Sequence, residues 1–191
     1  MRAPAAGAVL AAALLLFPSC CTPDRSPAGV RDLQGRPLDP LAASDARATV
    51  LVFADPECPI SNAFAPELGR LHAEFAPRGV RFFLVYADLS RTLEALRKHA
   101  AAFAFPMTAV RDGEHELVRR SGATLTPEAC VFLPGGELVY RGRIDDRYVD
   151  FGKQRAAPTT HDLCDALEAV LAGGTPARPW PPAIGCTIPG E

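Results

Sequence analysis

The segment Ala-Asp-Pro-Glu-Cys-Pro-Ile-Ser, residues 54–61, contains the residue best suited to chemistry, Cys58. An apolar run precedes it and an amphipathic pattern follows, which places the cysteine at a helix N-terminus. Unpaired backbone N–H groups and the helix dipole stabilise a thiolate there, and a thiolate is a nucleophile. The neighbouring carboxylate of Glu57 opposes a second negative charge. We therefore expect a moderately activated Cys58; the alternative is a buried, inert cysteine.

Residue periodicity predicts the elements that must position this cysteine. Continuous β-branched and apolar runs are typical of strands buried on both faces, and apolar residues three and four apart are typical of one helix face. Pro66 should kink the helix that follows Cys58. The predicted strands are 49–54, 80–87 and 107–111, then a hairpin of 129–133 and 137–141, with a smaller hairpin at 30–38. The predicted helices are 61–75, 91–103, 115–121 and 160–171.

Capping residues set two of these boundaries. Ser90 precedes the second helix and should cap its first turn. Thr159, with Asp162 three residues later, forms a capping box for the last helix, which Gly173 and Gly174 end. The order is a β-α-β unit followed by a hairpin and a closing helix. This order predicts an α/β sandwich with a mixed sheet.

Three features in the correct order resemble the thioredoxin fold, in its exported bacterial redoxin (AhpC/TSA-like) branch. Cys-Pro-Ile-Ser at 58–61 stands where that superfamily has C-x-x-C, and Pro66 stands where many members have a kinking proline. Thr126-Pro127 matches the cis-proline loop. The resemblance covers about residues 28–172 and implies a thioredoxin-like three-layer sandwich with a mixed central sheet.

The resemblance also implies roles for individual residues. Cys58 would be the attacking thiol. The loop of Thr126 and Pro127 would pack against it and receive the substrate backbone, with Pro59 and Ser61 contributing to substrate binding. The alternative for Pro127 is an ordinary trans proline at the start of a strand.

Two departures from the family pattern matter. Ser61 replaces the second cysteine of C-x-x-C, and a hydroxyl cannot close a disulfide. The peroxiredoxin motif P-x-x-x-T/S-x-x-C is also missing, because Leu51 and Asp55 occupy its proline and hydroxyl positions. A carboxylate three residues before the sulfur would repel the thiolate, which disfavours peroxidase activity.

The remaining cysteines suggest which thiol could resolve a Cys58 disulfide. Cys130 lies within a predicted strand and Cys164 beside the apolar face of the last helix, so we expect both to be packed thiols. Cys186 lies in a proline-containing tail that could fold back. It is the candidate resolving cysteine, and the alternative is an untethered tail thiol.

The N-terminus predicts export. Residues 1–20 combine a charged start with an apolar stretch, as in a secretory signal, and Phe-Pro-Ser before Cys20 resembles a lipoprotein signal with lipidation at Cys20. Residues 21–27 are a polar linker, 28–172 the redoxin domain and 173–191 an irregular tail. We expect an exported protein, either periplasmic or a lipoprotein anchored to the membrane, in an oxidising compartment where disulfides persist.

Composition excludes several classes. The formal charge of −2 argues against nucleic acid as a partner, and the longest apolar run, at 8–17, is shorter than a transmembrane helix. The four histidines lack metal-ligand spacing, so neither a metal nor another cofactor is expected. The sequence predicts a thiol-disulfide oxidoreductase acting on protein or small-molecule thiols and disulfides. The alternatives are a thiol peroxidase and a non-catalytic thioredoxin-fold binding module.

Overall fold

The computed structural model describes Met1 and residues 29–190. The predicted signal peptide, the lipidation site Cys20 and the linker lie outside the described residues. Among the described residues, no helix combines the length and the apolar character that crossing a membrane requires.

A six-stranded mixed sheet forms the centre of the protein, in the order β1-β4-β3-β2-β6-β7. Strands β2, β3 and β4 run parallel, whereas β1, β6 and β7 pair antiparallel with their neighbours. The strand bounds are β1 Val30–Asp32, β2 Ala48–Ala54, β3 Val80–Tyr86, β4 Thr108–Asp112, β6 Glu128–Phe132 and β7 Leu138–Gly142. The prediction of a mixed central sheet is confirmed.

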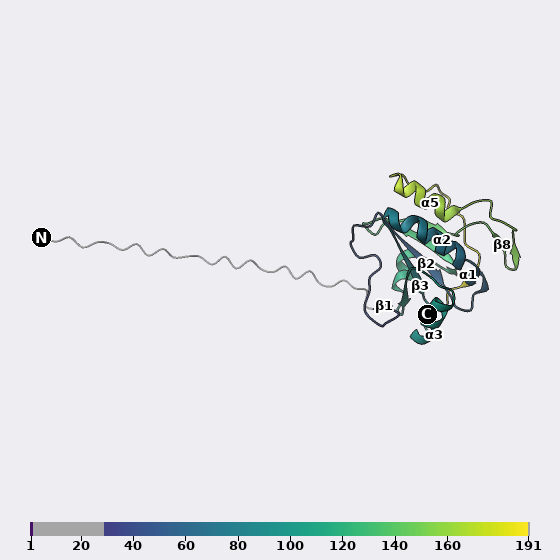
Figure 1. The fold of residues 1–191 in the computed structure, drawn as a ribbon, viewed down its shortest axis with the longest axis horizontal. Coiled ribbons are helices and arrows are strands. Elements are labelled where there is room, and N and C mark those ends of the chain that lie inside the picture. The colour runs from purple at the N-terminus through teal and green to yellow at the C-terminus, as the bar shows by residue number, and fades with distance from the viewer. Residues whose placement is uncertain (2–28, 191) are drawn as a thin grey trace.

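Helices cover both faces of this sheet. Alternate residues of β2 and β3 point to opposite faces, and all of β2 is buried, as the continuous apolar run predicted. One core contains Leu68, Leu96 and Leu167 of three helices, and the core on the opposite face contains Leu117 of a fourth. Figure 1 looks onto the three-helix face. The helix bounds are α1 Pro59–Ala63, α2 Ala65–Phe75, α3 Leu93–Ala102, α4 Glu116–Ser121 and α5 Asp162–Leu171, with a 3-10 turn at Ala76–Arg78.

Helix boundaries differ from the predictions at two places. The helix after Cys58 is broken at Phe64 into α1 and α2, and Pro66 lies in the first turn of α2, where a missing N–H costs nothing. Thr92, not Ser90, caps α3 and accepts a bond from the Ala95 N–H. The predicted N-terminal hairpin is present but short: the Asp32 N–H donates to the carbonyl of Arg36 and the Leu38 N–H to that of Val30, on either side of a bridge between Arg31 and Pro37, while the other edge of β1 pairs with β4.

The predicted capping box of α5 is also wrong. His161 stands at the N-cap position and makes no side-chain capping bond. Thr159 instead donates its N–H and its hydroxyl to the carboxylate of Asp146, which also accepts the N–H of Thr160. The threonines therefore tie the chain after β7 to the start of α5.

Two small two-stranded sheets complete the fold. β8, Tyr148–Asp150, and β9, Lys153–Gln154, form a hairpin that projects beyond α1 at the right of Figure 1. β10, Cys186–Thr187, pairs antiparallel with β5, Leu125–Thr126. The C-terminal segment, predicted to be irregular, therefore contains a strand and lies along the body of the protein.

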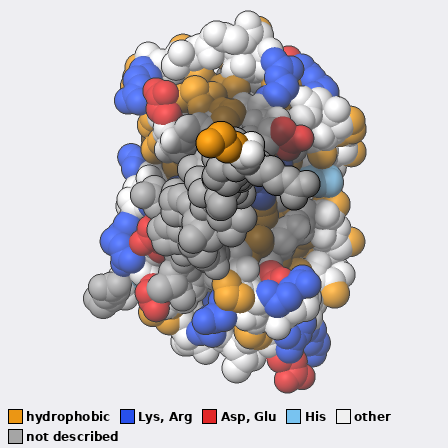
Figure 2. Space-filling model, turned by 90° about the vertical axis from the view of Figure 1, so that its left-hand side faces the viewer, with side chains coloured by type: hydrophobic (Ala, Val, Ile, Leu, Met, Phe, Trp, Pro, Cys, Tyr) orange, Lys and Arg blue, Asp and Glu red, His pale blue; other side chains and the backbone are white. Residues whose placement is uncertain are grey.

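Charged side chains of both signs are dispersed on the surface. On the face drawn in Figure 2, basic and acidic side chains alternate around the rim, and the visible described residues form no large patch of one sign. This arrangement agrees with the small net charge of −2.

Candidate functional site

Cys58 is the N-cap residue of α1, as the sequence predicted. Its sulfur accepts a hydrogen bond from the backbone N–H of Ser61 at 3.4 Å, and Pro59 occupies the first turn. The Cys58 side chain is almost fully buried, with 1% of the residue exposed. Ser61 is also buried, whereas Pro59 is exposed. The turn thus directs one backbone N–H, that of Ser61, at the sulfur.

The sheet register brings the proline loop to this cysteine. β6 runs antiparallel to β2 and pairs Phe53 with Glu128, so the residues before Glu128 lie beside the end of β2. The Thr126–Pro127 peptide bond is cis, as the resemblance implied. The Cys58 thiol donates a hydrogen bond to the carbonyl oxygen of Thr126 at 3.0 Å. Two segments 68 residues apart in sequence therefore meet at one sulfur.

Cys186 also lies beside Thr126 of the cis-proline loop. In the β5–β10 ladder Cys186 is the partner of Thr126, whose hydroxyl donates to the Cys186 carbonyl at 3.3 Å. Cys58 and Cys186 therefore both contact Thr126, and both residues are free thiols. Burial, followed by the hydrogen bond and charge of Cys58 and by the charge of Asp55, raises the pKa of the Cys186 thiol. The structure thus brings together all six sequence-predicted site residues of the folded part: Cys58, Pro59, Ser61, Thr126, Pro127 and Cys186.

Glu57 has an ion-pair partner that the sequence did not suggest. Its carboxylate is 71% exposed and pairs with Arg91 at 2.6 Å. The hydrogen bond and the charge of Arg91 lower the pKa of Glu57. Asp55 is the acidic residue whose charge acts on Cys186, and its side chain accepts the N–H of Glu57 at 2.6 Å.

Hydrogen-bonded side chains support the loop that precedes Cys58, through the carbonyl of Pro56. The sequence did not reveal this network. The Tyr86 hydroxyl and His99 Nδ1 are 2.7 Å apart, and His99 Nε2 lies 2.8 Å from Asn62 Oδ1. Asn62 in turn donates to the carbonyl of Pro56 at 2.9 Å. Burial lowers the pKa of His99, which favours the neutral ring that such a chain requires. A histidine on the apolar face of the predicted 91–103 helix was the available signal.

Cys130 and Cys164 lie away from this site. Cys130 is fully buried within β6, and burial raises its pKa strongly. Cys164 is half-buried on α5, and burial raises its pKa too. Both observations agree with the prediction of packed thiols.

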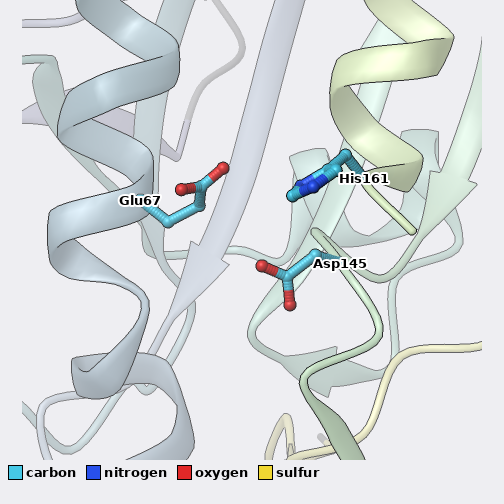
Figure 3. A group of neighbouring side chains, drawn as sticks. All are labelled: Glu67, Asp145 and His161. Carbon is cyan, nitrogen blue, oxygen red and sulfur yellow. The ribbon is translucent and has the colours of Figure 1, made fainter. Parts of the chain in front are cut away.

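A separate cluster joins Glu67, Asp145 and His161, whose potential ligand atoms lie within 4.8 Å of one another. Figure 3 shows the three side chains converging from α2, from the segment after β7 and from the start of α5. Arg147 pairs with Asp145 at 2.8 Å and reaches Glu67 at 4.0 Å, while Arg70 pairs with Glu67 at 2.7 Å. Two guanidinium groups therefore already balance the carboxylates, and the cluster is a structural ion-pair network.

Comparison with known proteins identifies the fold. No protein-family model matches the chain, and no curated protein matches it. An uncharacterized conserved protein from Geobacillus kaustophilus is similar, with 27% identity and a TM-score of 0.73, over 85% of this chain and 88% of that protein. A hypothetical protein from Sinorhizobium meliloti 1021 has 26% identity and a TM-score of 0.65, over 75% and 80% of the two chains.

A third similar structure has a named activity. It is a secreted disulfide oxidoreductase of Mycobacterium tuberculosis, homologous to E. coli DsbE. It shares 21% identity with this chain and has a TM-score of 0.50, over 74% of this chain and 92% of that protein. Together with the mixed sheet and the cis-proline loop beside an N-cap cysteine, these similarities show that the chain has the thioredoxin-like fold.

Proposed function

We propose that the protein is a thiol-disulfide oxidoreductase in which Cys58 attacks and Cys186 resolves. The observation that carries this proposal is that both cysteines converge on Thr126 of the cis-proline loop: the Cys58 thiol donates to the Thr126 carbonyl at 3.0 Å, and Cys186 is the ladder partner of Thr126. Cys186 thereby takes the part that the second cysteine of C-x-x-C plays in relatives and that Ser61 cannot play. Thr126, Pro127, Pro59 and Ser61 would form the surface that receives the substrate.

The reaction proceeds in two exchanges. The Cys58 thiolate attacks one sulfur of a substrate disulfide; a mixed disulfide forms, and the second substrate sulfur leaves as a thiolate and takes up a proton. Cys186 then attacks the Cys58 sulfur, a Cys58–Cys186 disulfide forms, and the first substrate sulfur leaves with the proton of Cys186. The substrate gains two electrons and the protein loses two. An external thiol or dithiol restores the starting state, and the reverse sequence oxidises a dithiol substrate.

The environments of the two sulfurs support this division of labour. The Ser61 N–H points at the Cys58 sulfur, which sits at a helix start, and the raised pKa of Cys186 keeps its proton in place. Cys186 would then lose that proton only when a leaving thiolate can accept it. A thiol peroxidase is less well supported, because Asp55 stands where that chemistry needs a hydroxyl and its carboxylate is engaged with the loop backbone.

Trapping the intermediates tests the mechanism. After reaction with a peptide disulfide, the wild-type protein should contain a Cys58–Cys186 bond, detected by non-reducing mass spectrometry. Cys186→Ser should accumulate the Cys58 mixed disulfide, and Cys58→Ser should form neither. Cys130→Ser and Cys164→Ser are matched controls that should behave as wild type. Rapid sulfenic acid formation at Cys58 with hydrogen peroxide alone would favour the peroxidase instead.

We also propose that the protein is exported and lipid-anchored through Cys20, which the N-terminal sequence and the secreted relative support. The mature protein should then begin at Cys20 and partition into detergent. A soluble product with a different N-terminus would contradict the anchor but not the export.

A further inference from the structure

The C-terminal strand occupies the edge at which a substrate would have to approach Cys58. β10 hydrogen-bonds to β5 directly before the cis proline, and the N–H of Ile188 donates to the Thr124 carbonyl at 2.9 Å. With Cys186 against it, Cys58 is only 1% exposed. A substrate disulfide therefore cannot reach the Cys58 sulfur while this strand is in place.

The tail contacts the protein through three residues in and around β10. Ile184 lines a small void with Phe64 and Pro127, Cys186 pairs with Thr126 beside Cys58, and Ile188 is 6% exposed in the core on the opposite face of the main sheet. Thr187 between them is exposed. The protein therefore contacts the tail at residues 184, 186 and 188, and not at Thr187.

Gly185 lies very close to the cis-proline loop. A Cβ atom at this position would overlap the carbonyl oxygen of Thr126 and would lie 3.1 Å from Cδ of Pro127. The edge thus accepts a glycine immediately before the cysteine and excludes larger residues. Gly190 in the same tail has nothing within 4 Å of such an atom, which makes it a matched control position.

From these contacts we infer that the tail is an exchangeable, built-in occupant of a peptide-binding edge. The partner that replaces it is an extended polypeptide with the pattern aliphatic, glycine, cysteine, any residue, aliphatic, paired antiparallel to β5. The inference rests on the proposed exchange chemistry at Cys58, and it names the substrate class and the segment that must move aside.

The test uses full-length protein in which Cys186→Ser removes the internal thiol. Gly185→Val in this background should displace the tail, and Gly190→Val should leave it in place. The probe is a peptide of residues 183–189 whose cysteine is linked to 2-thiopyridine. Attack by Cys58 forms the Cys58–peptide disulfide and releases 2-thiopyridone, whose absorbance gives the rate.

The Gly185→Val protein should react with this peptide at least about tenfold faster than the Gly190→Val protein, because its site is open. It should also react about tenfold more slowly with a peptide that has valine in place of glycine, since the added atoms overlap the loop. A peptide with aspartate in place of the second isoleucine should also react more slowly. Ile188→Ala provides a second opened variant should Gly185→Val fold poorly.

Equal rates for the two glycine variants would overturn the exchangeable tail. If the Gly185→Val protein reacts fast but at the same rate with all three peptides, the proposed substrate pattern is wrong. Failure of the proposed function would look different: Cys58 of the opened variant would then be no more reactive toward 2,2′-dithiodipyridine than an ordinary exposed cysteine.

Discussion

Cys58 and Cys186 contact each other, but the segments that carry them are attached to the protein very differently. Cys58 follows β2, a seven-residue strand paired along most of its length on both sides, and it begins a helix. Cys186 belongs to a two-residue strand paired on one side. Elements held by few contacts open locally at far lower free energy than the core. The comparison suggests a fixed nucleophile and a detachable resolving thiol.

Joining the two segments covalently should have the largest effect on stability. A Cys58–Cys186 disulfide would close a loop of about 130 residues in the unfolded chain, which could stabilise the protein by up to about 5 kcal/mol. Urea unfolding of the oxidised and dithiol forms should reveal the difference. Cys186→Ser should unfold identically under both conditions, and a wild-type protein with no difference would argue against the disulfide.

Weakening the fixed side should lower global stability. Phe75 of α2 is fully buried against the sheet that supports the Cys58 turn. Phe75→Ala should reduce the free energy of unfolding by about 3–5 kcal/mol, because it removes apolar contacts and leaves a cavity. Denaturant unfolding measures this. A loss of unfolding free energy below about 1 kcal/mol would mean that the region around α2 and Cys58 is not the more rigid of the two regions.

The fixed region was also the one that sequence could predict. Continuous apolar runs give β2 and β3 their burial on both faces, and local capping geometry places Cys58 at a helix start. The cis proline followed from the resemblance of the Thr126–Pro127 loop to that of the thioredoxin fold. These features depend on neighbours in sequence or on a pattern that repeats along one element.

The features that sequence missed depend on distant partners. The β5–β10 pairing joins residues about 60 positions apart, and nothing in a two-residue strand shows periodicity. Asp145 and Asp146 lie in a segment with charges of both signs, and both are buried because Arg147 and two threonines complete their bonds. Glu57 pairs with Arg91, a partner 34 positions along the chain.

Weakening the detachable side should change access more than stability. Ile188→Ala removes the buried anchor of β10, so the tail should open more often and Cys58 should be alkylated by iodoacetamide at least about tenfold faster. Global unfolding should change by less than about 0.5 kcal/mol if the tail detaches first. Thr187→Ala, at the exposed neighbouring position, is the control. A large loss of global stability without faster alkylation would show that the tail belongs to the cooperative core.

The smallest expected effect concerns the two acidic residues of the Cys58 loop. The charge of Asp55 raises the pKa of Cys186, so Asp55→Asn should lower that pKa and let Cys186 attack at lower pH. In a preformed Cys58 mixed disulfide, the midpoint of the pH profile for thiol release should move down by less than about one unit. Glu57→Gln should leave the profile unchanged, because that carboxylate is exposed and paired with Arg91. A shift for Glu57→Gln with none for Asp55→Asn would mean that Glu57, and not Asp55, is the carboxylate that acts on Cys186. The loop before Cys58 would then turn Glu57 inward when the tail moves away.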